Sequence, residues 1–409
     1  MDEANFIKLK QYIVEHLDQL PNQTDEELVE FIEQTVLSFS NEKFMTALQK
    51  INLVKKLFNS FRGLDILQPL LDDKEITEIM INSAEEIFIE KNGRVTQFSG
   101  KFESAHKLAD LIQTIVSKVN RIVNESSPIV DARLHDGSRV NVVLPPIALK
   151  GPTMTIRKFP EKPLTMADLV NRGTISSEVA DFLQQLIVSK FNIFISGGTG
   201  SGKTTFLNAL AQFIPEGERI ITIEDSAELQ ITTVPNLVSL ETRNANTELK
   251  GEINIRDLIR SSLRMRPNRI IIGEVRGAEA LDMLQAMNTG HDGSLSTGHA
   301  NSNTDMISRL ETMVLSGAVL PIQVIRKQIA SAIDIMIHLS RIRDGTRRVL
   351  EISEVTGVCD GEVQLNPLFS FVEENSSTVQ AVRGCLQATN HSLINKSKFH
   401  MAGVSAERW

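Results

Sequence analysis

Apolar positions in the first 62 residues recur at helical spacing. Phe6, Leu9 and Ile13 follow one another every three or four residues, and Thr24 with Glu27 forms a capping box ahead of a second apolar stripe. Stripes of this kind bury one face of each helix against its neighbours. The pattern predicts a small helical bundle over residues 1–62, to which we assign no chemistry.

The next hundred residues mix strand and helix patterns. Residues 107–123 form an amphipathic helical pattern, and 139–144 and 154–159 have the alternation and flanking turn residues typical of strands. This mixture predicts an α/β amino-terminal domain over residues 63–159. A linker containing prolines is expected over residues 160–175.

In the rest of the chain, short β-branched runs alternate with helical segments. Ile193–Ser196, Ile220–Glu224 and Ile270–Gly273 are apolar and bounded by turn or charged residues. Such an order predicts an α/β domain, with a parallel sheet covered on both faces, over residues 176–389. The tail, residues 390–409, has no assigned role.

Composition narrows the class of protein. A chain of 409 residues with 41% hydrophobic and 23% charged residues is typical of a soluble protein with two or three domains. The net charge of −8 and the pI of about 5.6 argue against a general affinity for nucleic acid. Cys359 and Cys385 form no disulfide or metal framework, which fits a reducing compartment. With no run of about 18 apolar residues, we expect a cytoplasmic protein without a transmembrane segment.

A glycine-rich phosphate loop lies between an apolar run and a helical run. It matches the pattern G-x-x-x-x-G-K-[ST], and with the following residue it comprises Gly197, Gly198, Thr199, Gly200, Ser201, Gly202, Lys203, Thr204 and Thr205. The glycines let backbone N–H groups point at phosphate oxygens, Lys203 adds positive charge, and Thr204 offers a hydroxyl to magnesium. A glycine-rich surface turn would not explain the flanking strand and helix. The loop therefore predicts nucleotide binding.

Acidic residues follow two of the predicted strands. Glu274 lies just beyond the carboxyl end of one strand, where ligands bind in open α/β sheets, and we predict that it is the general base or orients the attacking water. Glu224 and Asp225, with Glu228 nearby, follow another strand and could hold magnesium and its waters. Each could instead be a solvated acid at a strand end. Their joint occurrence after the phosphate loop favours the catalytic interpretation.

Two histidines, His291 and His299, lie in a stretch of small residues from Thr289 to Ala300. We expect the backbone there to approach phosphate closely, with His299 as a sensor of the terminal phosphate. A solvated loop histidine is the simple alternative. A metal site is a further one, but no cysteine or third histidine is nearby.

Four motifs in this order resemble the secretion ATPase superfamily, the type II/type IV secretion ATPases. They are the phosphate loop, the acidic box 223–229, the strand end 273–277 and the histidine box 289–300. Three stretches upstream of the phosphate loop are similar to the tight-adherence pilus branch of the TadA/CpaF kind: Ser126–Leu134, Asp136–Val140 and Thr155–Phe159. The resemblance covers roughly Gly63 to Phe371.

This resemblance implies a RecA-like P-loop ATPase domain and a hexameric ring, with ATP bound between the two larger domains. It points to Arg139 and Arg157 as the groups that reach the γ-phosphate, because a planar, permanently charged guanidinium suits that charge. From spacing alone, a surface salt bridge is the simpler role for each. Further candidates that we do not separate are Arg264, Arg266 and Arg269.

We therefore expect an ATP- and Mg²⁺-dependent motor that drives pilus assembly or protein export. It would be a homo-hexamer on the inner face of the cytoplasmic membrane, docked on an inner-membrane platform protein and independent of nucleic acid. A conjugation-type secretion ATPase shares every catalytic motif and is the first alternative. A RecA-like nucleic-acid translocase is the second, and the acidic composition speaks against it. A scaffold that binds nucleotide without hydrolysis would not need Lys203, Thr204, Glu224 and Glu274 together.

Overall fold

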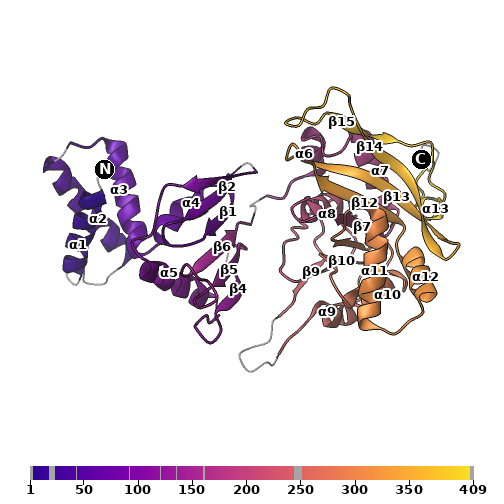
Figure 1. Cartoon of the computed structure of the whole chain (residues 1–409), viewed down its shortest axis with the longest axis horizontal. Helices are drawn as coiled ribbons and strands as arrows, with labels where there is room; N and C mark the ends of the chain where they lie inside the picture. Colours follow the sequence, from indigo (N-terminus) through magenta and orange to yellow (C-terminus); the bar gives the residue numbers. More distant parts are fainter. Residues whose placement is uncertain are drawn as a thin grey trace. The chain divides into compact units, whose positions relative to one another are not determined.

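The chain folds into two compact units, Met1–Pro160 and Glu161–Trp409 (Figure 1). This computed structural model describes a set of ranges that excludes short segments at both ends and between elements: residues 3–17, 24–42, 44–91, 93–119, 121–134, 136–159, 162–243 and 251–405.

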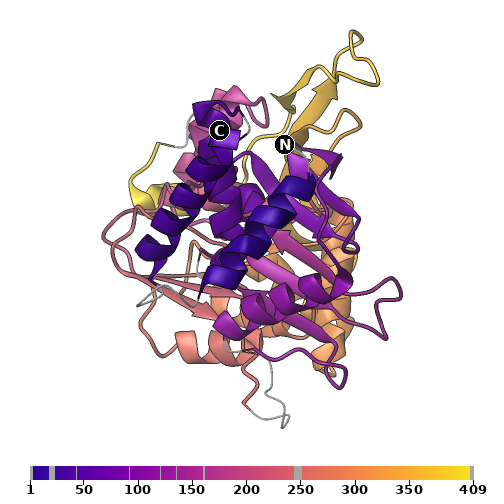
Figure 2. The same cartoon turned by 90° about the vertical axis from the view of Figure 1, so that its left-hand side faces the viewer.

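The first unit begins with helices α1 (Glu3–His16), α2 (Asp25–Glu42) and α3 (Ala47–Phe61), which lie alongside one another in Figure 2. Their apolar stripes meet in a core that includes the fully buried Ile13 and Leu57. Burying these stripes is what stabilises helices of this length.

An antiparallel six-stranded sheet follows, with its described strands in the order β3-β2-β1-β6-β5-β4. A short helical segment precedes it and one long helix interrupts it: η2 (Asp65–Leu67), α4 (Gln68–Asp72), β1 (Ile76–Ile81), β2 (Ile87–Lys91), β3 (Arg94–Phe98), α5 (Ala105–Lys118), β4 (Ile129–Arg133), β5 (Arg139–Val143) and β6 (Thr153–Arg157). Ile79, Val140 and Ile156 share one core with Leu108 of α5. Helix α5 therefore covers one face of this sheet, and alternate strand residues occupy the other.

The second unit is built on a nine-stranded sheet in the described order β15-β14-β13-β12-β7-β11-β10-β8-β9. The strands are β7 (Ile193–Gly197), β8 (Ile220–Glu224), β9 (Leu237–Glu241), β10 (Arg269–Ile272), β11 (Leu295–Gly298), β12 (Ile335–Arg341), β13 (Arg347–Cys359), β14 (Glu362–Glu373) and β15 (Gly384–Ala388). Strands β12 to β9 in this order are parallel, whereas β13, β14 and β15 extend the sheet antiparallel.

Helices cover both faces of this sheet. They are α6 (Met166–Asn171), α7 (Ser177–Val188), α8 (Lys203–Ala211), α9 (Ile255–Ser262), α10 (Glu279–Met287), α11 (Asn303–Gly317), α12 (Ile322–Ala332) and α13 (Ser397–Ala402). In β7, Ile193 and Ile195 pack with α6, α7, α8 and α13, while Phe194 packs with α9 to α12. Successive side chains of this strand thus pack into two separate cores, one on each face, as expected for a parallel sheet buried on both sides.

The structure adds a strand in the stretch 289–300, where none was predicted from the sequence. Residues 295–298 form β11, a fully buried strand between β7 and β10. The hydrophobicity pattern does not indicate this strand because it consists mostly of serine, threonine and glycine, although Ser296 and Thr297 are buried.

The predicted linker and the tail each contain a helix that was not predicted from the sequence. The predicted linker, residues 160–175, includes α6, whose Met166 and Leu169 lie in a core of the second unit; Pro160 and Glu161 are outside the described residues. In the tail, Phe399 of α13 is fully buried and its ring centroid lies 5.0 Å from that of Phe191. Lys398 forms an ion pair with Asp334 at 2.6 Å. The described part of the tail therefore completes the second unit.

Among the described residues, no helix combines the length and the apolar character needed to cross a membrane.

Candidate functional site

The phosphate loop connects β7 to α8 at the carboxyl end of the parallel strands (Figure 1). Gly200 has φ +71° and Gly202, the residue that caps α8, has φ +94°, which are values that favour glycine. A Cβ on Gly197 would lie 2.4 Å from the carbonyl oxygen of Leu339. The loop thus needs glycine for its turn and for its close approach to β12, while Lys203, Thr204 and Thr205 form the first turn of α8.

Lys203, His299 and Glu274 form a connected line. The Lys203 ammonium donates hydrogen bonds to the carbonyl oxygens of Gly197 and Gly198, both at 3.0 Å, and to Nδ1 of His299 at 3.2 Å. Nε2 of His299 lies 2.7 Å from Oε1 of Glu274. These residues come from the ends of β7, β11 and β10, which are neighbours in the sheet.

The protonation of His299 follows from its neighbours. Burial lowers the pKa of His299, the Lys203 ammonium lowers it further, and the Glu274 carboxylate opposes the effect. A neutral ring has one donor nitrogen, and the ammonium of Lys203 can only donate. Nδ1 is therefore the acceptor and Nε2 carries the proton that faces Glu274.

Arg276 links Glu274 to the second acidic group. Its guanidinium contacts Oε2 of Glu274 at 2.8 Å and Oδ2 of Asp225 at 3.3 Å. Asp225 directly follows β8, so the structure brings both predicted acidic groups to one edge of the sheet. Arg276 was part of a motif in the sequence, but its charge partners were not evident there.

Glu224 is the last residue of β8 and is only 4% exposed. Its carboxylate accepts hydrogen bonds from the backbone N–H groups of Glu228, at 2.8 Å, and Leu229. A Cβ on Gly273 would lie 2.8 Å from Cγ of Glu224, so the side chain packs over that glycine. These contacts orient Glu224; magnesium binding by Thr204, Glu224 and Asp225 stays a prediction.

Arg139 and Arg157 lie in the first unit, directly opposite each other on β5 and β6. Arg133 of β4 is opposite Arg139, and Glu78 of β1 is opposite Arg157. Directly opposed residues of antiparallel strands project from the same face. Arg133 was not among the predicted site residues, and its guanidinium lies 5.6 Å from the ring centroid of Phe159.

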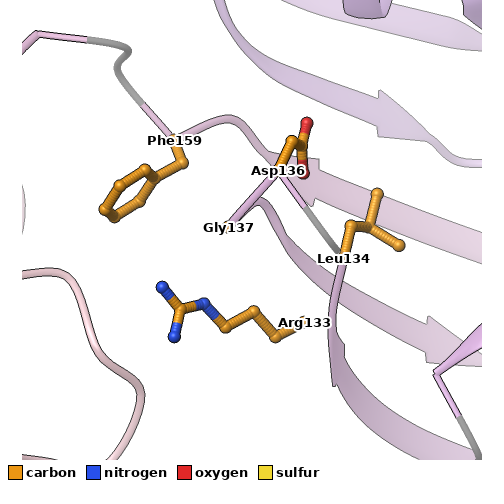
Figure 3. A pocket seen from close by; sticks show the side chains of 5 residues that line it. All are labelled: Arg133, Leu134, Asp136, Gly137 and Phe159. Carbon is orange, nitrogen blue, oxygen red and sulfur yellow. The ribbon is translucent and has the colours of Figure 1, made fainter. Parts of the chain in front are cut away.

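The four opposed residues form a row across the sheet in the order Glu78, Arg157, Arg139 and Arg133. A pocket of about 380 Å³ lies at the Arg133 end of this arginine row (Figure 3). The guanidinium of Arg133 lies near the ring of Phe159 in this pocket, and Leu134, Asp136 and Gly137 complete its lining. Gly137 has φ +88°, and a Cβ there would lie 3.0 Å from the Phe159 ring. The face of the sheet opposite to α5 therefore presents three arginines beside an aromatic ring.

Arg269 lies at the other end of the sheet from Glu274. It is fully buried, contacts both carboxylate oxygens of Glu218, at 2.6 and 2.9 Å, and donates to the carbonyl oxygen of Ile187. The Arg269 guanidinium thus connects segments of the second unit through these hydrogen bonds. Arg264 and Arg266 are exposed residues just after α9.

His338 is a second histidine near the loop, and no sequence motif contains it. It lies on β12 opposite Ser196, with Nδ1 2.9 Å from Oγ of Ser196, and is 6% exposed. Ser196 also contacts Asn303 of α11 at 3.0 Å, and Asn303 donates to Glu351 of β13 at 3.2 Å. This network holds the strand that leads into the phosphate loop.

Comparison with known proteins identifies the family. Residues 61–400 match the family described as Type II/IV secretion system protein. Conjugal transfer protein TrbB of Rhizobium radiobacter is 33% identical over 328 residues, covering 79% of this chain and 96% of its own length. Type IV secretion system protein VirB11 of Brucella suis is 34% identical over 320 residues, covering 71% and 88%.

The solved structures include the pilus retraction motor PilT with bound ADP, which matches with a TM-score of 0.52 at 18% identity over 83% of this chain and 87% of that chain. This likeness concerns the fold alone, and it confirms the predicted α/β class. The family match and the relatives confirm the resemblance predicted from the motifs: the chain belongs to the type II/IV secretion system protein family, the secretion ATPases.

Proposed function

We propose that the chain is a magnesium-dependent motor that hydrolyses ATP to ADP and phosphate. The observation that carries the proposal is the line of Lys203, His299 and Glu274 at the carboxyl ends of three neighbouring parallel strands. Nucleotide sites of open α/β sheets lie at this edge, and phosphoryl transfer needs cationic groups and a carboxylate held together there.

Each residue of the line has a task that its geometry supports. The backbone N–H groups of the loop and the Lys203 ammonium bind phosphate oxygens, and Lys203 exchanges its present acceptors for them. Glu274 accepts a hydrogen bond from Arg276 and lies 2.7 Å from Nε2 of His299, and these two neighbours orient its carboxylate toward an attacking water. His299 lies between the phosphate-binding lysine and that carboxylate.

Magnesium fits the donor set. Thr204 supplies a hydroxyl and Asp225 and Glu224 supply carboxylates, and within the described ranges no three His, Cys, Asp or Glu side chains cluster as a metal cage. Magnesium commonly binds through one or two protein oxygens, waters and the phosphates of its nucleotide. When bound, the ion neutralises charge on the phosphates.

The arginine row supports a role in phosphate recognition. Arg133, Arg139 and Arg157 lie on one face of the sheet, with Glu78 at the end of the row. A guanidinium is planar and permanently charged, which suits the charge of a phosphate. We therefore retain Arg139 and Arg157 as the groups that reach the γ-phosphate.

The motor would work as a homo-hexamer in the cytoplasm, at the inner face of the membrane and on an inner-membrane platform protein. Its work would be tight-adherence pilus assembly or protein secretion. A conjugation-type secretion ATPase is the alternative favoured by a specific observation, since a relative is named as a conjugal transfer protein and another as a type IV secretion protein. The net charge of −8 gives no support to direct work on nucleic acid.

Paired variants test the chemistry. Glu274→Gln keeps the shape of the strand end and should retain ATP binding while lowering phosphate release by roughly 10²-fold or more. Lys203→Ala should instead weaken binding. Titration with a non-hydrolysable ATP analogue and a phosphate-release assay in Mg²⁺ measure the two effects separately. Wild-type turnover in Glu274→Gln would remove this carboxylate from the mechanism.

A further inference from the structure

A guanidinium lies against the phosphate loop from a strand that contains none of the nucleotide motifs. Arg347 is the first residue of β13, 147 positions after Gly200 along the chain, and its Nε donates a hydrogen bond to the carbonyl oxygen of Gly200 at 2.8 Å. Its Cδ lies 3.3 Å from the position of a Cβ on Gly202. Arg347 therefore contacts the loop with both its charged end and its aliphatic stem.

The start of β13 is held firmly. The next residue, Arg348, donates a hydrogen bond to the carbonyl oxygen of Gly173, and the N–H of Val349 donates to the carbonyl oxygen of Thr174 at 3.1 Å. On its other side β13 pairs with β12, which pairs with β7, the strand that leads into the loop. These contacts fix the place from which Arg347 reaches the loop.

Holding a carbonyl of this loop also orients an N–H group. A planar trans peptide directs its carbonyl and its N–H in opposite directions, so the carbonyl of Gly200 sets the direction of the N–H of Ser201, which in this structure donates to the carbonyl oxygen of Gly198 at 3.3 Å. Peptides flanked by glycine rotate at little cost, and phosphate binding needs the N–H groups of the loop to face the ligand. A cationic donor makes a stronger hydrogen bond to that carbonyl than a neutral donor would.

We propose that Arg347 is a positioning residue of the nucleotide site: it restricts the rotation of the Gly200 peptide in the phosphate loop and thereby sets nucleotide affinity. This inference rests on the proposed nucleotide site. Because Arg347 acts through the loop and not on the γ-phosphate, it affects ATP and ADP alike. The catalytic line of Lys203, His299 and Glu274 does not pass through it.

The test is a titration of the full chain with ADP and with a non-hydrolysable ATP analogue, together with steady-state phosphate release. Arg347→Ala should weaken both nucleotides roughly three- to tenfold, the loss expected for one exposed charge-assisted hydrogen bond. KM should rise by a similar factor, with kcat changed by less than about twofold. Arg347→Lys retains a cationic donor and should recover part of the affinity.

Arg343→Ala is the matched control. Arg343 lies in the same β12–β13 turn but pairs with Glu373, so its removal should leave nucleotide affinity unchanged. Lys203→Ala distinguishes the nucleotide site itself from the role of Arg347 in that site. Wild-type affinity in Arg347→Ala with lost binding in Lys203→Ala would overturn the role of Arg347 and leave the nucleotide site standing.

Three further outcomes decide the inference. Unchanged binding in Lys203→Ala would overturn the nucleotide site and the inference together. Selective loss of the ATP analogue in Arg347→Ala would overturn the inference, since it would show direct contact with the terminal phosphate. Equal losses in Arg347→Ala and Arg343→Ala would show a general effect of surface charge and would also overturn it.

Discussion

At the scale of single residues, His338 couples proton uptake to folding. Burial lowers its pKa; Glu351 and Asp305 oppose this shift, and the charge of Lys203 reinforces it. The unfolded chain takes up this proton near the ordinary histidine pKa of about 6.5, whereas the folded chain does so only at lower pH. The unfolded state therefore binds more protons in that window, and stability falls as the pH drops below about 6.5.

The variant His338→Gln removes this titration. Between about pH 7.5 and about pH 5.5 its Tm should fall less than that of the wild type, where one such histidine contributes at most roughly 1.4 kcal/mol per pH unit. Thermal denaturation at both pH values measures the difference. Equal losses of Tm in the two proteins would show that His338 titrates normally in the folded chain.

Arg139 and Arg157 test the role of the first unit at residue scale. Alanine at either position should lower ATP turnover far more than it lowers Tm, because both side chains project from a sheet face rather than into the core. A group that reaches the γ-phosphate distinguishes ATP from ADP. Equal changes in affinity for the two nucleotides would favour a surface salt bridge instead.

Residue types in fixed spacing were enough to predict the loop, Glu274 and His299, because phosphate binding imposes a local pattern. Arg347 and His338 could not be predicted in this way. Both act from strands that follow the loop by more than 130 residues, and their contacts depend on the pairing of β12 with β7 and β13.

At the scale of elements, the tail shows what a sequence pattern leaves open. No role was assigned to residues 390–409 from the sequence, because this tail lies outside the stretch that resembles the secretion ATPases. In the structure Phe399 fills a place beside Phe191, and Lys398 reaches Asp334, Asp292 and the carbonyl oxygen of Lys190. A single buried ring and one lysine attach α13 to the amino ends of the strands.

Removing that ring should weaken the second unit. Phe399→Ala creates a cavity that costs roughly 3 kcal/mol, which lowers Tm by about 6–12 °C in a unit of this size. Met401→Ala is the control, since Met401 in the same helix is 79% exposed and should leave Tm almost unchanged. Calorimetry of both variants checks this, and an unchanged Tm in Phe399→Ala would contradict the packing role of α13.

The strands of the second unit also show which elements a sequence pattern can predict and which it cannot. The β-branched runs predicted β7, β8 and β10 because a buried parallel strand is apolar throughout. Strand β11, with the sequence Leu-Ser-Thr-Gly, is equally buried but owes its place to pairing with β7 and β10. Of its polar side chains, that of Thr297 donates a hydrogen bond to the carbonyl oxygen of Gly273, at 2.7 Å.

At the scale of the whole molecule, the chain folds into two compact units and belongs to the family of secretion ATPases. A cleft that closes on ATP does directed work only if its movement reaches neighbouring subunits and cargo. Closed rings repeat one heterologous interface by rotation. No local sequence pattern encodes such an interface, so the ring rests on the resemblance and not on spacing or composition.

The claim that this chain is an ATP-driven ring motor is tested most directly by its mass in solution. Light scattering of the purified full chain with a non-hydrolysable ATP analogue and Mg²⁺ should give a particle near six times 45.5 kDa, with smaller species when nucleotide is left out. The Lys203→Ala variant should not respond to the analogue. A wild-type chain that stays monomeric at micromolar concentration with every nucleotide would contradict the ring motor and leave only a nucleotide-binding protein.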